Sequence, residues 1–415
     1  MSRAMPEAPI SHPRARRRRR RWPWVVATSV VVLGVVFYGG GGYHFSNVID
    51  ERALDARALR AATADLDPDV EITALADSVE LTVADTVSLR PLTDGLGVAL
   101  EGVQGLRWGG GYGRIAPAVI DPVTAAAGIV VREFSLVNGA LPLPGTLAEL
   151  DVRAFPMDPA DSGLGLERLT VPGPLGDYPA WLGPADGRTW AIVVHGNSLS
   201  PADGLRMVPI LTQAGFPTMV ASYRNDPGAP EDPSGKLRYG LTEWQDLEAM
   251  VAYALDQGSD GVVLDGYSMG GGIVMAFLQR SVLADEVRAA ILDAPMLDFS
   301  ATVDDNASRE TLPVGGLPLP SSLTAVAKLM ADLRFDVAWS SLDYLADTSR
   351  YDVTFLVFHG TDDTTVPIAT SRRFAQALPQ QVELVECDRA EHIGCWNLDP
   401  DEYGATVQRF LAGTV

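Results

Sequence analysis

From about residue 166 to residue 415, short apolar runs alternate with amphipathic stretches. Apolar runs of this length suit strands that are buried on both faces by helices. Strands are expected at 166–171, 178–182, 190–194, 218–223, 262–265, 289–292, 355–358 and 382–385. Helices are expected at 205–214, 242–257, 270–279, 368–378 and 401–411. Because the first two strands predict a hairpin, we expect an α/β domain with a mostly parallel eight-stranded sheet and helices on both faces.

The chain begins with a strongly basic segment, which is followed by an uncharged one. Residues 1–21 contain eight Arg and one Glu, and no charged residue occurs between Trp22 and Ile49. A helix over residues 22–45 would be about 36 Å long, more than the ~30 Å hydrocarbon core of a bilayer. Aromatic residues lie at both ends of this segment, and aromatic side chains favour the two membrane–water interfaces. The basic residues precede the segment, and positive charge favours the cytoplasmic side of a membrane. We therefore expect residues 1–21 to be a basic cytoplasmic tail and residues 22–45 to be a transmembrane signal anchor.

A cleaved secretory signal has the same order of basic and apolar segments and is the alternative to an anchor. Cleavage requires small residues, and only the glycines at 39–42 approach that pattern. Under both alternatives the remainder of the chain lies outside the cytoplasm. An uncleaved chain would be a single-pass protein of the cell membrane, whereas cleavage would leave a mature terminus near residue 43.

Residues 46–165 are predicted to form an extracytoplasmic, β-containing appendage. Residues 46–65 have charged residues, Ala and Leu at helical spacing, which predicts an amphipathic helix that Pro68 ends. Short β-rich runs follow at 70–72, 79–83, 87–89, 98–100 and 129–134. The Gly-rich segment 107–114 lacks the Gly-Lys-Ser/Thr ending of a phosphate-binding loop, so we expect a tight loop there.

The loop after the expected strand at 262–265 contains a Gly-x-Ser-x-Gly pattern, Gly266-Tyr-Ser268-Met-Gly270. The pattern alone is weak evidence, but here it joins a buried strand to an apolar helix. A sharp turn strains the serine backbone and leaves no space for side chains at Gly266 or Gly270. The Ser268 hydroxyl is then raised above the sheet, and the N–H of Met269 points to the same space. Ser268 is therefore the candidate nucleophile and Met269 a candidate oxyanion donor.

Position and elimination select one of the five histidines as the candidate general base. His392 follows the last expected strand, in the segment Ala-Glu-His-Ile-Gly. The remaining histidines either lie in the membrane end of the chain or begin a His-Gly loop: His12, His44, His195 and His359. We expect the last two to be structural, and His392 to accept a proton from Ser268.

These features resemble the α/β-hydrolase superfamily, in particular its branch similar to prolyl oligopeptidases and serine aminopeptidases. The resemblance covers the carboxy-terminal 250 residues and implies the α/β-hydrolase fold. In similar enzymes, the backbone N–H after a His-Gly pair supplies the second oxyanion donor. In this chain His195-Gly196 is followed by Asn197, to which that role is transferred.

The resemblance also assigns a carboxylate. The segment that begins at His359 matches the H-G-x-x-D-x-x-V-P loop of the superfamily, whose Asp orients the base. Counting from His359 places this Asp at Asp363, and the neighbouring Asp362 is the alternative. The resulting order Ser268, Asp363, His392 is the order of triad members in α/β-hydrolases.

Two further features lie near the expected site. Cys387 and Cys395 flank His392 and would form a disulfide in an oxidising compartment, with two free buried thiols as the alternative. Residues 296–343 form an insertion after the sixth expected strand, with a Pro-rich loop at 311–320 and an amphipathic helix at 321–333. In similar hydrolases a cap over the site lies at this position, and we expect a cap-like insertion here.

Charge and cysteine content exclude several partners. After residue 21 the chain has 24 basic and 52 acidic residues, a net charge of −28, which would repel a phosphate backbone. We therefore expect no nucleic-acid binding. Two cysteines exclude a four-cysteine zinc site, and nothing in the sequence implies a metal or an organic cofactor.

The residues and the resemblance together predict a membrane-anchored serine hydrolase that cleaves carboxylic esters through an acyl-enzyme. The expected partners are the membrane and a small-molecule ester or peptide substrate. A serine peptidase is the alternative function from the same branch. An acyltransferase and a non-catalytic binding module are less favoured, the latter because a complete Ser-Asp-His set is present.

Overall fold

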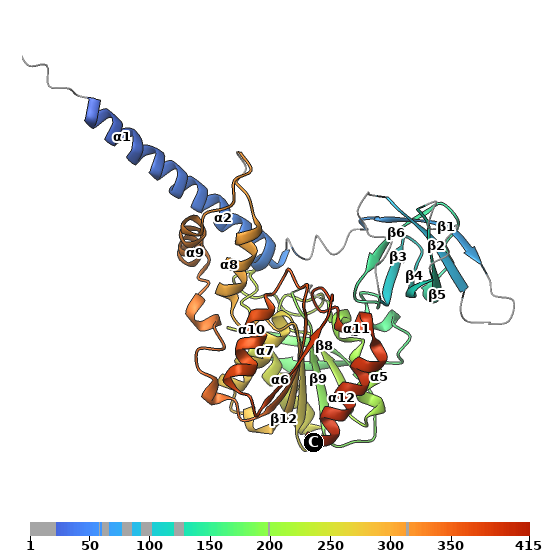
Figure 1. Ribbon diagram of the computed structural model, residues 1–415. Coiled ribbons are helices and arrows are strands. Elements are labelled where there is room, and N and C mark those ends of the chain that lie inside the picture. Colours follow the sequence, from blue (N-terminus) through green and yellow to red (C-terminus); the bar gives the residue numbers. More distant parts are fainter. Residues whose placement is uncertain are drawn as a thin grey trace, which may run out of the picture.

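The computed structural model describes residues 22–57, 59, 66–76, 85–92, 102–119, 128–197, 200–312 and 315–415. Figure 1 shows three parts, which are a long helix at the amino-terminal end, a small β-barrel and a larger α/β domain. The basic tail expected at 1–21 lies outside the described residues.

The α/β domain is built on one eight-stranded sheet with the order β14-β13-β12-β11-β9-β10-β8-β7. β7 and β8 form a hairpin, β8 pairs antiparallel with β10, and the other neighbours are parallel. From β7 to β14 the strands span Glu167–Gly173, Gly176–Gly183, Trp190–Val194, Thr218–Ala221, Val262–Tyr267, Val287–Asp293, Thr354–Gly360 and Val382–Cys387. The predicted mostly parallel sheet with an antiparallel start is confirmed.

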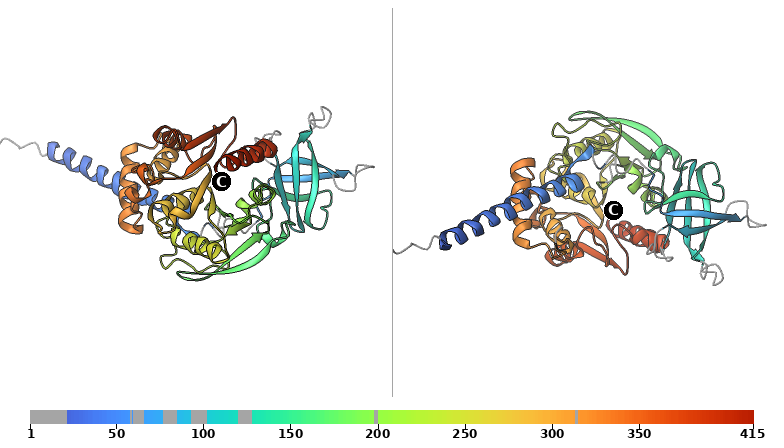
Figure 2. Two further views of the ribbon diagram at one scale, coloured as in Figure 1. Left: turned by 90° about the horizontal axis from the view of Figure 1, so that it is seen from below. Right: turned by 90° about the horizontal axis from the view of Figure 1, so that it is seen from above.

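Helices cover both faces of this sheet (Figures 1 and 2). α5 and α12 lie on one face, and α6, α7 and α10 lie on the other. In chain order these helices span Met207–Gln213, Trp244–Asp256, Met269–Arg280, Ile368–Ala377 and Pro400–Thr414. Along β9, Ile192 and Val194 enter the core beside α6 and α7, whereas Ala191 and Val193 enter the core beside α5 and α12. This double burial explains why the strands are continuously apolar.

The insertion after β12 contributes two helices above the carboxyl ends of the strands (Figure 1). α8 spans Phe299–Arg309, and α9 spans Ser321–Phe335. α9 agrees with the helix expected at 321–333, but α8 was not predicted. Asp298 caps α8 by accepting a hydrogen bond from the N–H of Ala301.

The appendage contains a closed six-stranded barrel with the order β1-β2-β5-β4-β3-β6. Its strands are Val70–Ala76, Asp85–Pro91, Gln104–Trp108, Gly111–Val119, Val130–Gly139 and Thr146–Asp151. β1, β2 and β5 were expected from the sequence, whereas the runs at 79–83 and 98–100 lie outside the described residues. β3, β4 and β6 were not predicted. The Gly-rich segment 107–114, which was expected to be a tight loop, forms the turn of the β3–β4 hairpin together with parts of both strands.

The amino-terminal helix is continuous from α1 (Trp22–Val35) through Val36–Gly40 and α2 (Gly41–Ile49) to Leu54. Among the described residues, the segment Trp24–Leu54 is the one helix that is long and apolar enough to cross a membrane. Its first part projects away from the rest of the molecule (Figure 1). The helix expected over 46–65 is interrupted at Asp55, which is extended, and residues 56, 57 and 59 are helical again. Residues 58 and 60–65 lie outside the described part of the chain.

The second half of this helix is packed against the α/β domain. Leu54 is buried in the core of that domain, and its carbonyl accepts a hydrogen bond from the N–H of Leu237 at 2.8 Å. Lys236 forms ion pairs with Asp50 at 2.6 Å and with Asp55 at 3.2 Å. The end of this helix, from Asp50 to Asp55, therefore packs against the α/β domain.

Candidate active site

Ser268 lies in the turn between β11 and α7, with φ 50° and ψ −114°. A Cβ on Gly266 would lie 2.9 Å from the backbone of Gly270, and a Cβ on Gly270 would lie 2.1 Å from the carbonyl oxygen of Val194. Neither position accepts a side chain, as the motif predicts. The N–H of Ser268 donates to the carbonyl of Asp293 at 2.9 Å, which ties the strained turn to the neighbouring strand.

The structure brings Ser268, Asp363 and His392 together in one chain of hydrogen bonds. His392 Nε2 lies 2.9 Å from Ser268 Oγ, and His392 Nδ1 lies 2.8 Å from Asp363 Oδ2. Asp363 comes from the loop after β13, and His392 from the loop after β14. These distances allow a proton to pass from the serine to the imidazole while the carboxylate holds the ring.

The Asp363 side chain has no exposed surface, yet it is held as an anion. Burial raises the pKa of Asp363, but hydrogen bonds from His359 and His392 outweigh burial and hold the pKa well below its usual value. Asp363 Oδ1 also accepts the N–H groups of Thr365 and Val366 at 2.8 and 2.9 Å. Asp363, and not its exposed neighbour Asp362, therefore faces His392.

The two histidines of the His-Gly loops are buried and hydrogen-bonded. His195 Nε2 lies 2.7 Å from Asp226 Oδ2, and the ring stacks on Tyr223. Burial alone would lower the pKa of His195, but the Asp226 carboxylate outweighs it and raises the pKa. His359 bonds to the Ser371 hydroxyl at 2.8 Å, with its other nitrogen 3.3 Å from Asp363 Oδ2. Both rings support loops of the site, as expected.

The two expected oxyanion donors lie on opposite sides of Ser268 in the chain. Met269 is the first residue of α7, where backbone N–H groups are free of intrahelical partners. Asn197 lies in the loop after β9, next to Gly196. A Cβ on Gly196 would lie 3.3 Å from Ser268 Cβ, so this loop passes close to the serine. Asn197 and Ser268 line the same cavity.

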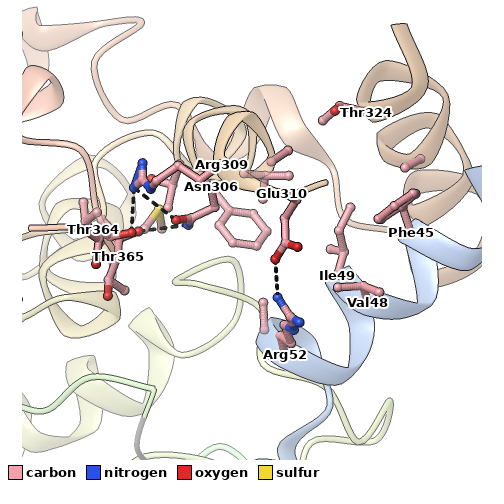
Figure 3. A pocket seen from close by; sticks show the side chains of 18 of the residues that line it. Phe45, Val48, Ile49, Arg52, Asn306, Arg309, Glu310, Thr324, Thr364 and Thr365 are labelled. Carbon is pink, nitrogen blue, oxygen red and sulfur yellow. Dashed lines mark hydrogen bonds and ion pairs between the residues drawn. The ribbon is translucent and has the colours of Figure 1, made fainter. Parts of the chain in front are cut away.

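This cavity has a volume of about 490 Å³ and a mostly apolar wall. Figure 3 shows lining residues from α8, α9, the loop after β13 and the helix that follows the apolar span. The wall includes Tyr239, which stacks on Phe299 with ring centroids 4.1 Å apart. The one carboxylate among the described lining residues is Glu310, and it is paired with Arg52 at 2.7 Å.

A family match and one solved structure agree with this fold. Residues 206–394 match the prolyl oligopeptidase family. An esterase from Pyrococcus furiosus is 19% identical over 62% of this chain and 94% of that chain, with a TM-score of 0.50. A Mycobacterium tuberculosis puromycin-hydrolyzing peptidase is 16% identical over 80% of this chain and 46% of that chain, with a TM-score of 0.48. A thermophilic esterase from Thermogutta terrifontis is 17% identical over 60% of this chain and 98% of that chain, with a TM-score of 0.41.

The carboxy-terminal domain is an α/β-hydrolase. The family match covers the segment from α5 to the loop that carries His392, and the fold is that of the P. furiosus esterase. Within the superfamily, the domain is related to prolyl oligopeptidases, and the protein is a serine hydrolase.

A disulfide joins the two ends of the loop that carries the hydrolase's candidate base. Cys387 ends β14, and Cys395 begins the short helix α11 (Cys395–Leu398). Their Cα atoms are 5.6 Å apart, within the normal range for a disulfide. The bridge closes a short loop around His392, as the spacing of the cysteines allows.

The sequence analysis missed a buried polar network beneath the hydrolase site. Arg206 is fully buried and donates to the carbonyl of Ile393 at 3.0 Å and to Asn397 Oδ1 at 3.1 Å. Asp293 accepts from the Tyr403 hydroxyl at 3.1 Å. Burial raises the pKa of Asp293 to about 6, although Arg206 and Tyr403 act to lower it. The sequence signal that could have indicated this network is Arg206 itself, a charged residue at the start of an otherwise apolar helix.

Proposed function

We propose that this protein is a membrane-anchored serine hydrolase that cleaves carboxylic esters with Ser268, His392 and Asp363. The observation that carries the proposal is the continuous hydrogen-bond chain from Asp363 through His392 to Ser268, with Ser268 at the floor of an apolar cavity. Ser268 lies in a strained turn at a helix N-terminus, where a nucleophile is exposed and the local dipole favours negative charge.

In the first half of the reaction, Ser268 Oγ attacks the ester carbonyl as His392 Nε2 accepts the hydroxyl proton. The N–H groups of Met269 and Asn197 stabilise the tetrahedral oxyanion, each donor contributing about 3–4 kcal/mol in a preorganised site. The intermediate collapses, the C–O bond to the leaving alcohol breaks, and His392 returns the proton to that alcohol. A water then attacks the acyl-enzyme by the same route and releases the acid.

The cavity favours an ester over the substrate of an aminopeptidase. An aminopeptidase requires a carboxylate free to bind the substrate's amino group, whereas Glu310, the acidic residue among the described lining residues, is engaged by Arg52. The prolyl oligopeptidase match supports a serine peptidase as the second candidate. Its expected signature is hydrolysis of aminoacyl anilides at rates that exceed those for p-nitrophenyl esters.

A fluorophosphonate probe tests the nucleophile, and a substrate panel tests the class. Wild-type protein should be labelled, Ser268→Ala should not, and p-nitrophenyl esters should be cleaved faster than aminoacyl anilides. Absence of labelling in the wild type, or labelling of Ser268→Ala, would refute the proposal that Ser268 is the nucleophile of a serine hydrolase. Faster anilide cleavage would replace the esterase by the peptidase.

We place the hydrolase domain outside the cytoplasm, on an uncleaved anchor. The Cys387–Cys395 disulfide supports an oxidising compartment, because such bonds are rare in the cytosol. The packing of Gly41 and Gly42 against α9 gives the glycine run a structural use other than signal cleavage. Mass spectrometry of the mature protein should find the basic segment retained, and a terminus near residue 43 would contradict the anchor.

A further inference from the structure

The cavity that contains Ser268 is closed on one side by the helix that continues from the apolar span. Phe45, Val48, Ile49 and Arg52 all line it. Their spacing of i, i+3, i+4 and i+7 places them on one face of that helix. Figure 3 shows Phe45, Val48 and Ile49 along this helix, opposite Glu310. The end of the proposed membrane anchor and the helical turns that follow it therefore form a wall of the candidate active site.

The outer end of the cavity lies close to the membrane end of the chain. Tyr38, near the end of the apolar span, bonds through its hydroxyl to Ser322 Oγ at 3.1 Å, at the start of α9. Tyr side chains favour the interface between headgroups and water. Phe45 follows Tyr38 by seven residues, which is about 10 Å along a helix. The cap and the cavity mouth therefore lie within about two helical turns of that interface.

Close packing fixes α9 against this helix. A Cβ on Gly42 would lie 2.6 Å from Val326, and one on Gly41 would lie 3.1 Å from Leu323, so small residues are needed where the two helices meet. Arg334, near the end of α9, lies over the ring of Tyr43, 4.1 Å from its centroid. Figures 1 and 2 show α9 lying across the amino-terminal helix.

α9 also carries apolar side chains that the protein does not cover. Leu329 is 59% exposed and Leu333 is 78% exposed. They lie on the side of α9 opposite its buried face, which consists of Leu323, Thr324, Ala327 and Ala331. On a helical projection Ser322 lies on the same side as the two leucines, and Ser322 contacts Tyr38. In the loop before α9, Leu317 is a third exposed apolar side chain, at 62%.

We propose that the substrate is a long-chain acyl ester resident in the membrane, and that its acyl chain enters the cavity along the face formed by Phe45, Val48 and Ile49. The inference rests on the proposed esterase function and names its substrate class. Passing an acyl chain through water would reduce its population about fourfold per exposed methylene group. An apolar path from the interface to Ser268 avoids this cost, with Leu329 and Leu333 resting on the lipid surface.

The test compares two esters with the same leaving group. Full-length protein is reconstituted in dioleoylphosphatidylcholine vesicles and assayed with 4-methylumbelliferyl oleate in the bilayer and 4-methylumbelliferyl acetate in water. The measured quantity is the ratio of kcat/KM for oleate to kcat/KM for acetate. The wild type should hydrolyse both, and Ser268→Ala should hydrolyse neither.

Three variants then separate the cavity wall from the membrane-facing surface. Ile49→Trp fills the cavity beside the helix and should lower the oleate-to-acetate ratio at least tenfold. Leu333→Glu places a charge on the exposed side of α9 and should lower the ratio at least fivefold. Val282→Glu is the matched control, since Val282 is 89% exposed and follows the far end of α7. Its ratio should stay within twofold of the wild type.

The outcomes distinguish this inference from the proposed function. If wild-type protein hydrolyses neither ester and Ser268 is not labelled by fluorophosphonate, the proposed function fails. If acetate is hydrolysed in a Ser268-dependent manner but oleate in vesicles is not, the membrane-resident substrate is wrong and the esterase stands. The same conclusion follows if Leu333→Glu and Val282→Glu give equal ratios while fluorophosphonate labels both variants.

Discussion

The imidazole of His392 assists Ser268 only in one tautomer, with the proton on Nδ1 and a free lone pair on Nε2. The Asp363 carboxylate selects that tautomer by accepting from Nδ1 at 2.8 Å. Asp363→Asn keeps the shape but offers an N–H to the ring, so kcat should fall about 10³–10⁴-fold. The measurement is kcat with a soluble ester, with Asp362→Asn as the control, because the Asp362 side chain is exposed and should leave kcat within twofold. Retention of a tenth of wild-type kcat in Asp363→Asn would remove Asp363 from the mechanism.

The buried carboxylate of Asp293 should make stability depend on pH. Its pKa is raised to about 6 because burial disfavours the anion, against an ordinary value of 3.8 in the unfolded chain. Above pH 6 both states are ionised and the folded protein bears the cost of a buried charge. Between pH 6 and pH 4 the folded state takes up a proton first, so this group adds up to about 3 kcal/mol of stability as the pH falls.

Asp293→Asn removes this contribution. The difference in unfolding free energy, wild type minus variant, should therefore increase by about 2–3 kcal/mol between pH 7 and pH 4. Urea unfolding of both proteins, followed by tryptophan fluorescence at several pH values, measures it. Curves that stay parallel over this range would show that Asp293 does not titrate between the two states.

The loop between β14 and α11 depends on its disulfide. Closing a loop of this size contributes about 2–3 kcal/mol in the loop-entropy model. Because His392 lies between the bridged cysteines, a Cys387→Ser/Cys395→Ser protein should lose both thermal stability and part of its kcat. Reductant should then affect the wild type and leave the double variant unchanged. A fully reduced wild type, verified by thiol titration, that keeps its stability and kcat would contradict this prediction.

The elements that could be predicted are those whose signal is local. The strands of the α/β sheet are continuous apolar runs, and the turn at Ser268 is marked by two glycines that the backbone requires. β3, β4 and β6 lack such a signal. Gly113 in β4, for example, leaves the space that the Phe134 ring fills inside the barrel, where a Cβ would lie 2.1 Å from that ring. A glycine used in this way resembles a loop residue until its distant partner is known.

The long-range contacts of the site could not be predicted for the same reason. The glycines at 39–42 resemble a weak cleavage site in the sequence, but Gly41 and Gly42 lie against α9, nearly 300 residues later. The order Ser268, Asp363, His392 was available because a known family supplied the pattern. No pattern indicated that α2 forms a wall of the cavity, since that contact depends on the packing of the whole chain.

The buried amide of Asn397 lies where the barrel meets the hydrolase domain. Asn397 Nδ2 donates to the carbonyls of Val103 and Val152, at 2.6 and 2.8 Å, just before β3 and just after β6. Asn397→Ala removes both of these hydrogen bonds and leaves Val152 with its weaker bond from Arg206, at 3.3 Å. Loss of a buried partner costs about 1–3 kcal/mol, so the junction should open more often. Hydrogen exchange around Val103 should accelerate at least tenfold, and kcat should fall because His392 lies five residues from Asn397. Asn138→Ala, which removes an exposed amide of the same barrel, should change neither quantity. If exchange accelerates while kcat is unchanged, the barrel is docked through Asn397 but does not position the base.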